Sequence, residues 1–205
     1  MSKFKEDLRK EEVLGVFLDK IYKKLNIALT RVSDSAMQRQ GIDLIYSHAD
    51  ETVHIDEKAQ LHYLNRDLPT FTFELSYTKG TLPRQGWLFD PDKKTDYYFL
   101  VTGILAKNKE LTHASNITGC KITAVNRYKL INHLKTLGLT PEKLAFYDSE
   151  LRENRQFGQH LIEELDPKNG SLHFTEHLQE NPINLKLRLD YLLEAKVAKR
   201  IYPIG

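Results

Sequence analysis

The alternation of polar and apolar residues over positions 53–60 constrains the fold of this chain more than any other feature. Strand side chains alternate between the two faces of a sheet. One face would therefore carry His54, Asp56, Lys58 and Gln60, and the other Val53, Ile55, Glu57 and Ala59. A short strand at Ile42–Tyr46 and a hydrophilic turn at Ser47–Thr52 precede this segment. The pattern predicts a β-hairpin whose polar face holds Asp43, Asp56 and Lys58.

The rest of the sequence predicts an α/β domain around this hairpin. Apolar residues at helical spacing indicate a helix over residues 11–26, and residues 27–40 are expected to be a polar connector. Thr70–Tyr77 is expected to be a third antiparallel strand of the same sheet. Further along we expect a buried strand at the end of 86–101, a helix over 125–137 capped by Gly138, a helix from Thr140-Pro141, a strand at 183–189 and a short helix within 190–202.

Composition limits the classes of function. The chain has 205 residues, and its net charge of +2 comes from 30 basic and 28 acidic residues, so any nucleic-acid surface must be a local patch. The single cysteine, Cys120, excludes a disulfide framework and a cysteine-rich zinc site. No apolar run approaches the length of a membrane span, and the first residues are too charged for a signal peptide, so we expect a cytoplasmic protein without a membrane partner.

Two carboxylates and a lysine on one polar face are typical of metal-dependent phosphodiester cleavage. Magnesium is a hard cation that takes oxygen ligands and keeps several waters. We therefore expect Asp43 and Asp56 to bind Mg²⁺, with Mn²⁺ as a substitute. Lys58 would orient or deprotonate the attacking water, or stabilise the phosphate in the transition state, and the sequence does not separate these roles.

Asp43 followed by the D-x-K triplet Asp56-Glu57-Lys58 resembles the PD-(D/E)XK nuclease superfamily, whose fold is restriction-endonuclease-like. The resemblance implies a single domain over 1–205, with an αβββαβ core of about 11–137, a central mixed sheet flanked by helices, and a C-terminal elaboration of about 138–205. It also implies that the main-chain carbonyl of Glu57 is a metal ligand. Many members carry an acidic residue on the first helix, and here helical spacing favours Glu11 over Glu12. DNA is the expected substrate because most of the superfamily acts on DNA, and RNA stays open.

Several expectations carry alternatives. Gln60 would contact a phosphate or a base, or would be an ordinary exposed strand residue, and Glu74 would reach the metal from the third strand or face solvent. The polar hairpin face would be a set of solvated ion pairs if the triplet were fortuitous. A non-catalytic module that binds nucleic acid or protein through the same face is the second functional hypothesis, and a homodimer is compatible with the sequence. DNA contacts, or ordinary solubilising charge, are expected from basic residues in loops, namely Arg31, Arg39, Lys79, Arg84, Lys93 and Lys94.

Overall fold

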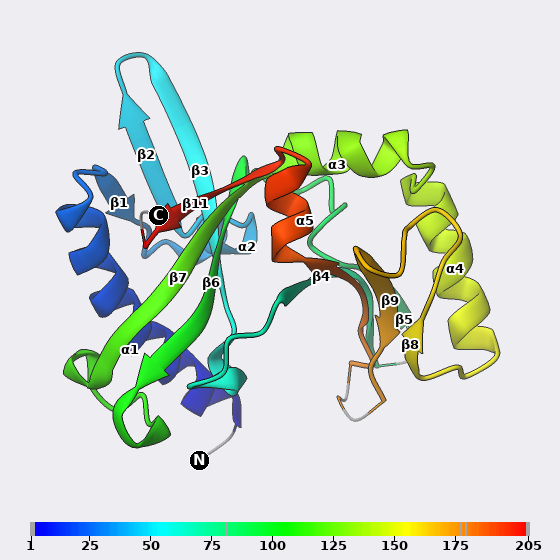
Figure 1. The fold of residues 1–205 in the computed structure, drawn as a ribbon, viewed down its shortest axis with the longest axis horizontal. Helices are drawn as coiled ribbons and strands as arrows, with labels where there is room; N and C mark the ends of the chain where they lie inside the picture. The colour runs from blue at the N-terminus through cyan, green and yellow to red at the C-terminus, as the bar shows by residue number, and fades with distance from the viewer. Residues whose placement is uncertain (1–2, 81, 177, 179, 204–205) are drawn as a thin grey trace. The chain divides into compact units, whose positions relative to one another are not determined.

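The chain forms two compact units, each with its own β-sheet (Figure 1). The structure is a computed structural model that describes all residues except 1–2, 81, 177, 179 and 204–205. The first unit comprises residues 1–68, 94–125 and 199–205, and the second comprises 69–93 and 126–198. These bounds differ from the expected division near residue 138, because the chain enters the second unit at Pro69, leaves it, and enters it again at Asn126. The expectation of a single domain stays a prediction.

A six-stranded mixed sheet forms the centre of the first unit, in the order β1-β2-β3-β6-β7-β11. Its strands are β1 (Leu29–Arg31), β2 (Leu44–His48), β3 (Glu51–Ala59), β6 (Tyr97–Ala106), β7 (Ile117–Asn126) and β11 (Ala198–Tyr202). The pairs β1–β2 and β2–β3 are antiparallel, whereas β3–β6 is parallel. The unit also contains α1 (Lys3–Lys24), α2 (Ser35–Arg39), and the 3₁₀ turns η1 (Leu61–Tyr63), η2 (Lys107–Lys109) and η3 (Ala114–Asn116). The expected α/β class with a mixed sheet and helices is therefore confirmed.

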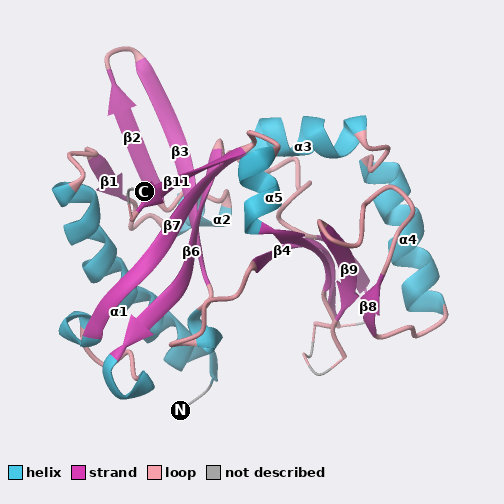
Figure 2. Cartoon of the chain, viewed as in Figure 1, coloured by secondary structure: helices cyan, strands magenta, loops and turns pink. Residues whose placement is uncertain are grey.

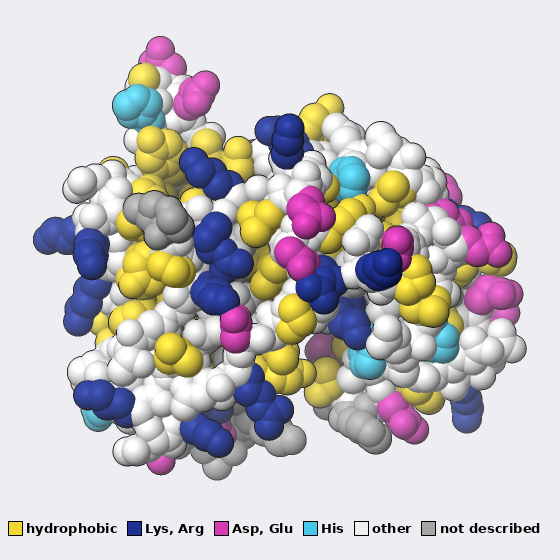
Figure 3. Space-filling view, in the orientation of Figure 1, with side chains coloured by type: hydrophobic (Ala, Val, Ile, Leu, Met, Phe, Trp, Pro, Cys, Tyr) yellow, Lys and Arg dark blue, Asp and Glu magenta, His cyan; other side chains and the backbone are white. Residues whose placement is uncertain are grey.

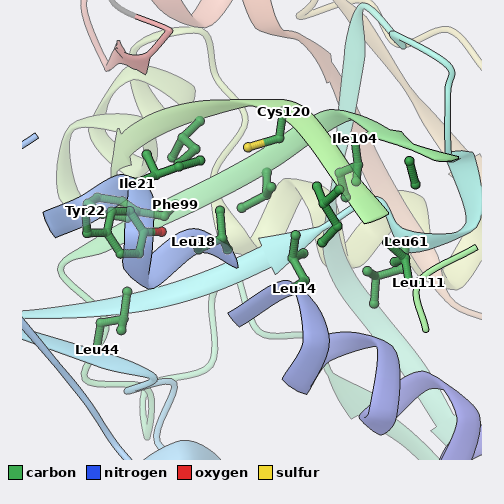
Figure 4. Packing of buried hydrophobic residues seen from close by; sticks show 14 of the residues in the cluster. Leu14, Leu18, Ile21, Tyr22, Leu44, Leu61, Phe99, Ile104, Leu111 and Cys120 are labelled. Carbon is green, nitrogen blue, oxygen red and sulfur yellow. The ribbon is translucent and has the colours of Figure 1, made fainter. Parts of the chain in front are cut away.

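Helix α1 packs against the sheet through an apolar stripe. Leu14, Leu18, Ile21 and Tyr22 repeat at spacings that place them on one face of a helix, and all four are at most 6% exposed. They join a core cluster that includes Leu44, Phe99 and Ile104 from the strands (Figure 4). The helix begins earlier than expected, at Lys3. It stops as predicted near Asn26, whose φ of 55° is incompatible with a continuing helix.

The predicted hairpin is present as β2 and β3. The register pairs Leu44 with Ile55 and His48 with Glu51. The expected connector over residues 27–40 is more ordered than predicted, because Leu29–Arg31 pairs with β2 and Asp34 caps α2 by accepting hydrogen bonds from the N–H groups of Ala36 and Met37.

An antiparallel sheet in the order β5-β4-β10-β9-β8 lies in the second unit. Figure 2 shows β4, β8 and β9 of this sheet together with the helices of the unit. Its strands are β4 (Thr70–Lys79), β5 (Leu82–Gln85), β8 (Gly158–His160), β9 (Gly170–Phe174) and β10 (Ile183–Arg188), and its helices are α3 (Arg127–Thr136), α4 (Pro141–Glu153) and α5 (Leu189–Glu194). Both helix signals are confirmed. Gly138 has a φ of 87° directly after α3, and the Thr140 hydroxyl caps α4 by accepting from the N–H of Lys143.

The expected partner of one strand and the expected end of one helix are wrong. Thr70–Tyr77 does form a strand, but it pairs with β5 and β10 in the second sheet, and the position beside β2 is taken by β1. Alternation fixes which side chains share a face and says nothing about which strand is the neighbour. The expected helix within 190–202 ends at Glu194, and Ala198–Tyr202 is a strand of the first sheet.

Among the described residues, no helix is both long enough and apolar enough to span a membrane.

Candidate active site

The hairpin of β2 and β3 brings Asp43, Asp56 and Lys58 together. Asp43 directly precedes β2, whose first residue, Leu44, pairs with Ile55, the neighbour of Asp56 in β3. Asp56 is 2% exposed, and its Oδ1 lies 2.8 Å from the Lys58 ammonium. The Lys58 side chain keeps 31% of its surface exposed, so one end of the site reaches solvent.

Asp43 is held by its main chain and by its carboxylate. Its N–H donates to the Ile55 carbonyl at 2.9 Å, its carbonyl accepts from the Val32 N–H at 2.8 Å, and its Oδ2 accepts from the Glu57 N–H at 2.9 Å. Burial, then the charge of Asp56 and a hydrogen bond between the two carboxyl groups, raise the pKa of Asp43 to about 7, while Lys58 and the Glu57 N–H oppose the shift. Near neutral pH the metal-free pair therefore has a proton available to share.

The Glu57 side chain leaves the opposite face of β3, as the alternation predicts. Its Oε1 accepts from the Tyr22 hydroxyl of α1 at 2.5 Å, and its Oε2 accepts from Nη1 of Arg31 at 2.5 Å. The loop assignment of Arg31 is wrong, because Arg31 lies in β1 and its guanidinium binds both Glu57 and Asp19. It is also wrong for Arg39, Lys79 and Arg84, which lie in α2, β4 and β5.

The three remaining candidates lie in different places. Glu11 is on α1 and lines a cavity of about 630 Å³ together with Asp43 and Glu57. Burial raises the pKa of Glu11, Lys58 lowers it and Asp7 raises it, so Glu11 is within electrostatic range of Lys58. Gln60 follows the last residue of β3 with a φ of −86° and a ψ of 63°, so the alternation that placed it beside Lys58 ends at Ala59. Glu74 lies on β4, in the second unit rather than in the sheet of the candidate site.

The donor set suits a hard cation. Asp43 and Asp56 offer carboxylate oxygens in a largely buried position, and the main-chain carbonyl of Glu57, the residue after Asp56, is a further oxygen donor. Within the described part of the chain, no cluster of three or more His, Cys, Asp or Glu side chains could hold a metal. A cation here would complete its coordination with water or substrate, as Mg²⁺ commonly does. The residues therefore fit Mg²⁺ better than a zinc ion, which prefers nitrogen and sulfur ligands.

Comparison of the chain with family models, with curated proteins and with solved structures finds no match. Membership of the PD-(D/E)XK superfamily stays a prediction that depends on Asp43, on the D-x-K triplet and on the strands that carry them.

The partners of Glu57 were missed from the sequence. Tyr22 falls within the apolar pattern that predicts a helix over residues 11–26, and Arg31 within the segment predicted to be a polar connector. One signal was present: Glu57 falls on the apolar face of its strand, between Ile55 and Ala59, and a carboxylate buried there needs partners.

Proposed function

We propose that this protein is a Mg²⁺-dependent nuclease of restriction-endonuclease-like fold that hydrolyses phosphodiester bonds in DNA, with Asp43, Asp56 and Lys58 at its active site. The observation that carries the proposal is the convergence of these three side chains. The charge of Asp56 raises the pKa of Asp43, and the Asp56 carboxylate binds the partly exposed ammonium of Lys58. Perturbed pKa values of this kind are frequent at functional sites.

The order of elements in the first unit supports this fold. Helix α1 is followed by β1, β2 and β3, whose neighbouring pairs are antiparallel as at the start of an αβββαβ core, and β3 then pairs in parallel with β6. Two departures are clear. The short helix α2 lies between β1 and β2. Between β3 and β6 the described residues form η1, β4 and β5 and no α-helix, so the second helix of that core is missing from its expected place.

Each residue has a distinct task in this proposal. The carboxylates of Asp43 and Asp56 and the carbonyl of Glu57 would hold Mg²⁺. The bound ion would polarise the phosphate and make a water more acidic. Lys58, oriented by Asp56 and open to solvent, would donate to a phosphate oxygen or to the attacking water.

Binding of DNA would depend on local contacts. Lys and Arg side chains occur at separate places on the viewed face of the first unit, interspersed with uncharged residues (Figure 3). With a net charge of only +2, the protein should bind nucleic acid weakly and with a steep dependence on salt.

A cleavage assay tests the proposal. Purified protein is incubated with duplex, single-stranded and branched DNA and with RNA, across a range of Mg²⁺ and Mn²⁺ concentrations. We expect cleavage of DNA that EDTA abolishes and that Asp56→Ala removes. Asp67→Ala is the matched control, because Asp67 also binds a lysine, Lys121, but at an exposed position outside the site.

The other outcomes separate the alternatives. If every substrate stays intact while DNA binds without any need for metal, the non-catalytic binding module replaces the nuclease. If neither metal nor nucleic acid binds, the triplet is fortuitous.

A further inference from the structure

Glu57 connects the candidate site to α1 and β1. It lies between Asp56 and Lys58 in β3, its N–H donates to the Asp43 carboxylate, and its side chain binds Tyr22 and Arg31. We propose that Tyr22 and Arg31 are positioning residues. Through the Glu57 side chain they hold the Glu57 main chain, and with it the Asp43 carboxylate, in the arrangement that binds metal. The effect on metal binding rests on the proposed function, whereas the positioning of Asp43 does not.

The Glu57 carboxylate is fixed from two sides. The Tyr22 hydroxyl binds one oxygen and Arg31 binds the other, both at 2.5 Å, and only 11% of the Glu57 side chain is exposed. Burial raises the pKa of Tyr22, and the Glu57 charge raises it further, so the phenol stays protonated and remains a donor. With both oxygens bound, the side chain has little freedom to rotate.

Arg31 extends the connection to α1. Its Nη1 donates to Glu57, while its Nε and Nη2 donate to Oδ1 of Asp19 at 3.1 and 2.6 Å. The planar guanidinium provides donors in both directions, which a lysine could not reproduce. The next residue, Val32, donates its N–H to the Asp43 carbonyl, so the chain at the end of β1 also contacts Asp43 directly.

Stability alone is a weak explanation for this network. Buried ion pairs are often no more stabilising than apolar residues of similar size. The Tyr22–Glu57–Arg31 network instead shares a residue with the candidate site, since Glu57 supplies the N–H that binds Asp43. Residues that orient metal ligands typically change metal affinity about 10- to 100-fold when they are replaced.

A positioning role and a purely electrostatic role of Arg31 predict opposite changes in divalent-cation affinity when Arg31 is replaced. Arg31→Met removes a positive charge close to two carboxylates. By charge alone, the variant should bind a divalent cation more tightly. If Arg31 positions Glu57, the variant should bind the cation more weakly. Tyr22→Phe changes no charge and removes only one hydroxyl, so it isolates the positioning effect and still serves if Arg31→Met fails to fold.

The experiment compares wild type, Arg31→Met and Tyr22→Phe with the control Arg188→Met, which breaks an exposed pair with Asp190 in the second unit. Hydrogen exchange of the ¹⁵N-labelled Glu57 amide is measured in metal-free protein, and Mn²⁺ affinity is measured by electron paramagnetic resonance. In both test variants we expect faster exchange at the Glu57 amide and Mn²⁺ binding weakened about 10-fold. The control should stay within about twofold of wild type.

Two results would overturn the inference. The first is an unchanged Glu57 exchange rate in both test variants. The second is tighter Mn²⁺ binding by Arg31→Met together with unchanged binding by Tyr22→Phe. If wild type itself binds no Mn²⁺, the proposed function fails, and the exchange rates in metal-free protein alone decide whether Tyr22 and Arg31 position Glu57.

Discussion

In metal-free protein, the free energy of unfolding of Asp43→Asn minus that of wild type should increase from acidic to alkaline pH. Burial and Asp56 raise the pKa of Asp43 from 3.8 to about 7. Between these values the folded protein binds a proton that the unfolded chain has lost, so the wild-type free energy of unfolding falls as pH rises through this window and levels off above about pH 7. The asparagine amide carries no titrating proton, so the Asp43→Asn variant lacks this loss.

The magnitude follows from the shift. Each pKa unit corresponds to about 1.4 kcal/mol, so the full loss is about 4 kcal/mol. The loss is spread over the pH interval from 3.8 to about 7, and about two pH units of that interval lie above pH 5. The stability advantage of Asp43→Asn over wild type should therefore be about 2–3 kcal/mol larger at pH 8 than at pH 5.

Urea denaturation in EDTA at both pH values measures this difference. Asp67→Asn, which removes an exposed lysine-paired carboxylate, is the matched control and should show no such trend. Saturating Mg²⁺ should shift the difference in favour of wild type, because the ion stabilises wild type by about 2.7 kcal/mol at 100 times its dissociation constant and the variant by less. A stability difference between Asp43→Asn and wild type that is the same at both pH values would refute the reasoning.

Three further predictions concern the same unit. Lys58→Ala should keep its fold and still bind Mn²⁺ but lose about 10²–10⁴ in cleavage rate, because the ammonium acts on charge in the transition state. Comparable single-turnover rates at saturating metal would contradict this role. Mg²⁺ affinity measured by calorimetry should fall up to about tenfold per pH unit below pH 7, because protons compete with the metal at Asp43, and a flat profile would exclude Asp43 as a ligand. Burial raises the pKa of Cys120 to about 12, so thiol reagents should label it at pH 8 only after the protein unfolds, and rapid labelling of the folded protein would contradict its burial.

The local parts of this fold could be predicted from the sequence. The β2–β3 hairpin follows from alternation and a short turn, and α4 follows from Thr140 and Pro141 at its start, because both signals depend on a few consecutive residues. The placement of Asp43 close to Asp56 follows in turn from the hairpin. The elements of the candidate site were therefore predictable, although their function still awaits a test.

The long-range parts could not be predicted. The Thr70–Lys79 strand pairs with Ile183–Arg188, more than a hundred positions away, and nothing in either segment specifies the other. Ala198–Tyr202 joins the first sheet beside β7, and its own residues do not specify that neighbour. The contacts of Glu57 with Tyr22 and Arg31 depend on how α1 and β1 pack on β3, so the residues inferred to position the site became visible only in three dimensions.

The central claim is that Asp43 and Asp56 share a divalent cation. A crystal structure grown with Mn²⁺, with anomalous data collected near the manganese edge, tests it most directly. We expect one anomalous peak between the two carboxylates, about 2.1 Å from an oxygen of each and close to the Glu57 carbonyl. A structure at saturating Mn²⁺ that shows no peak beside Asp43 and Asp56 would contradict the account.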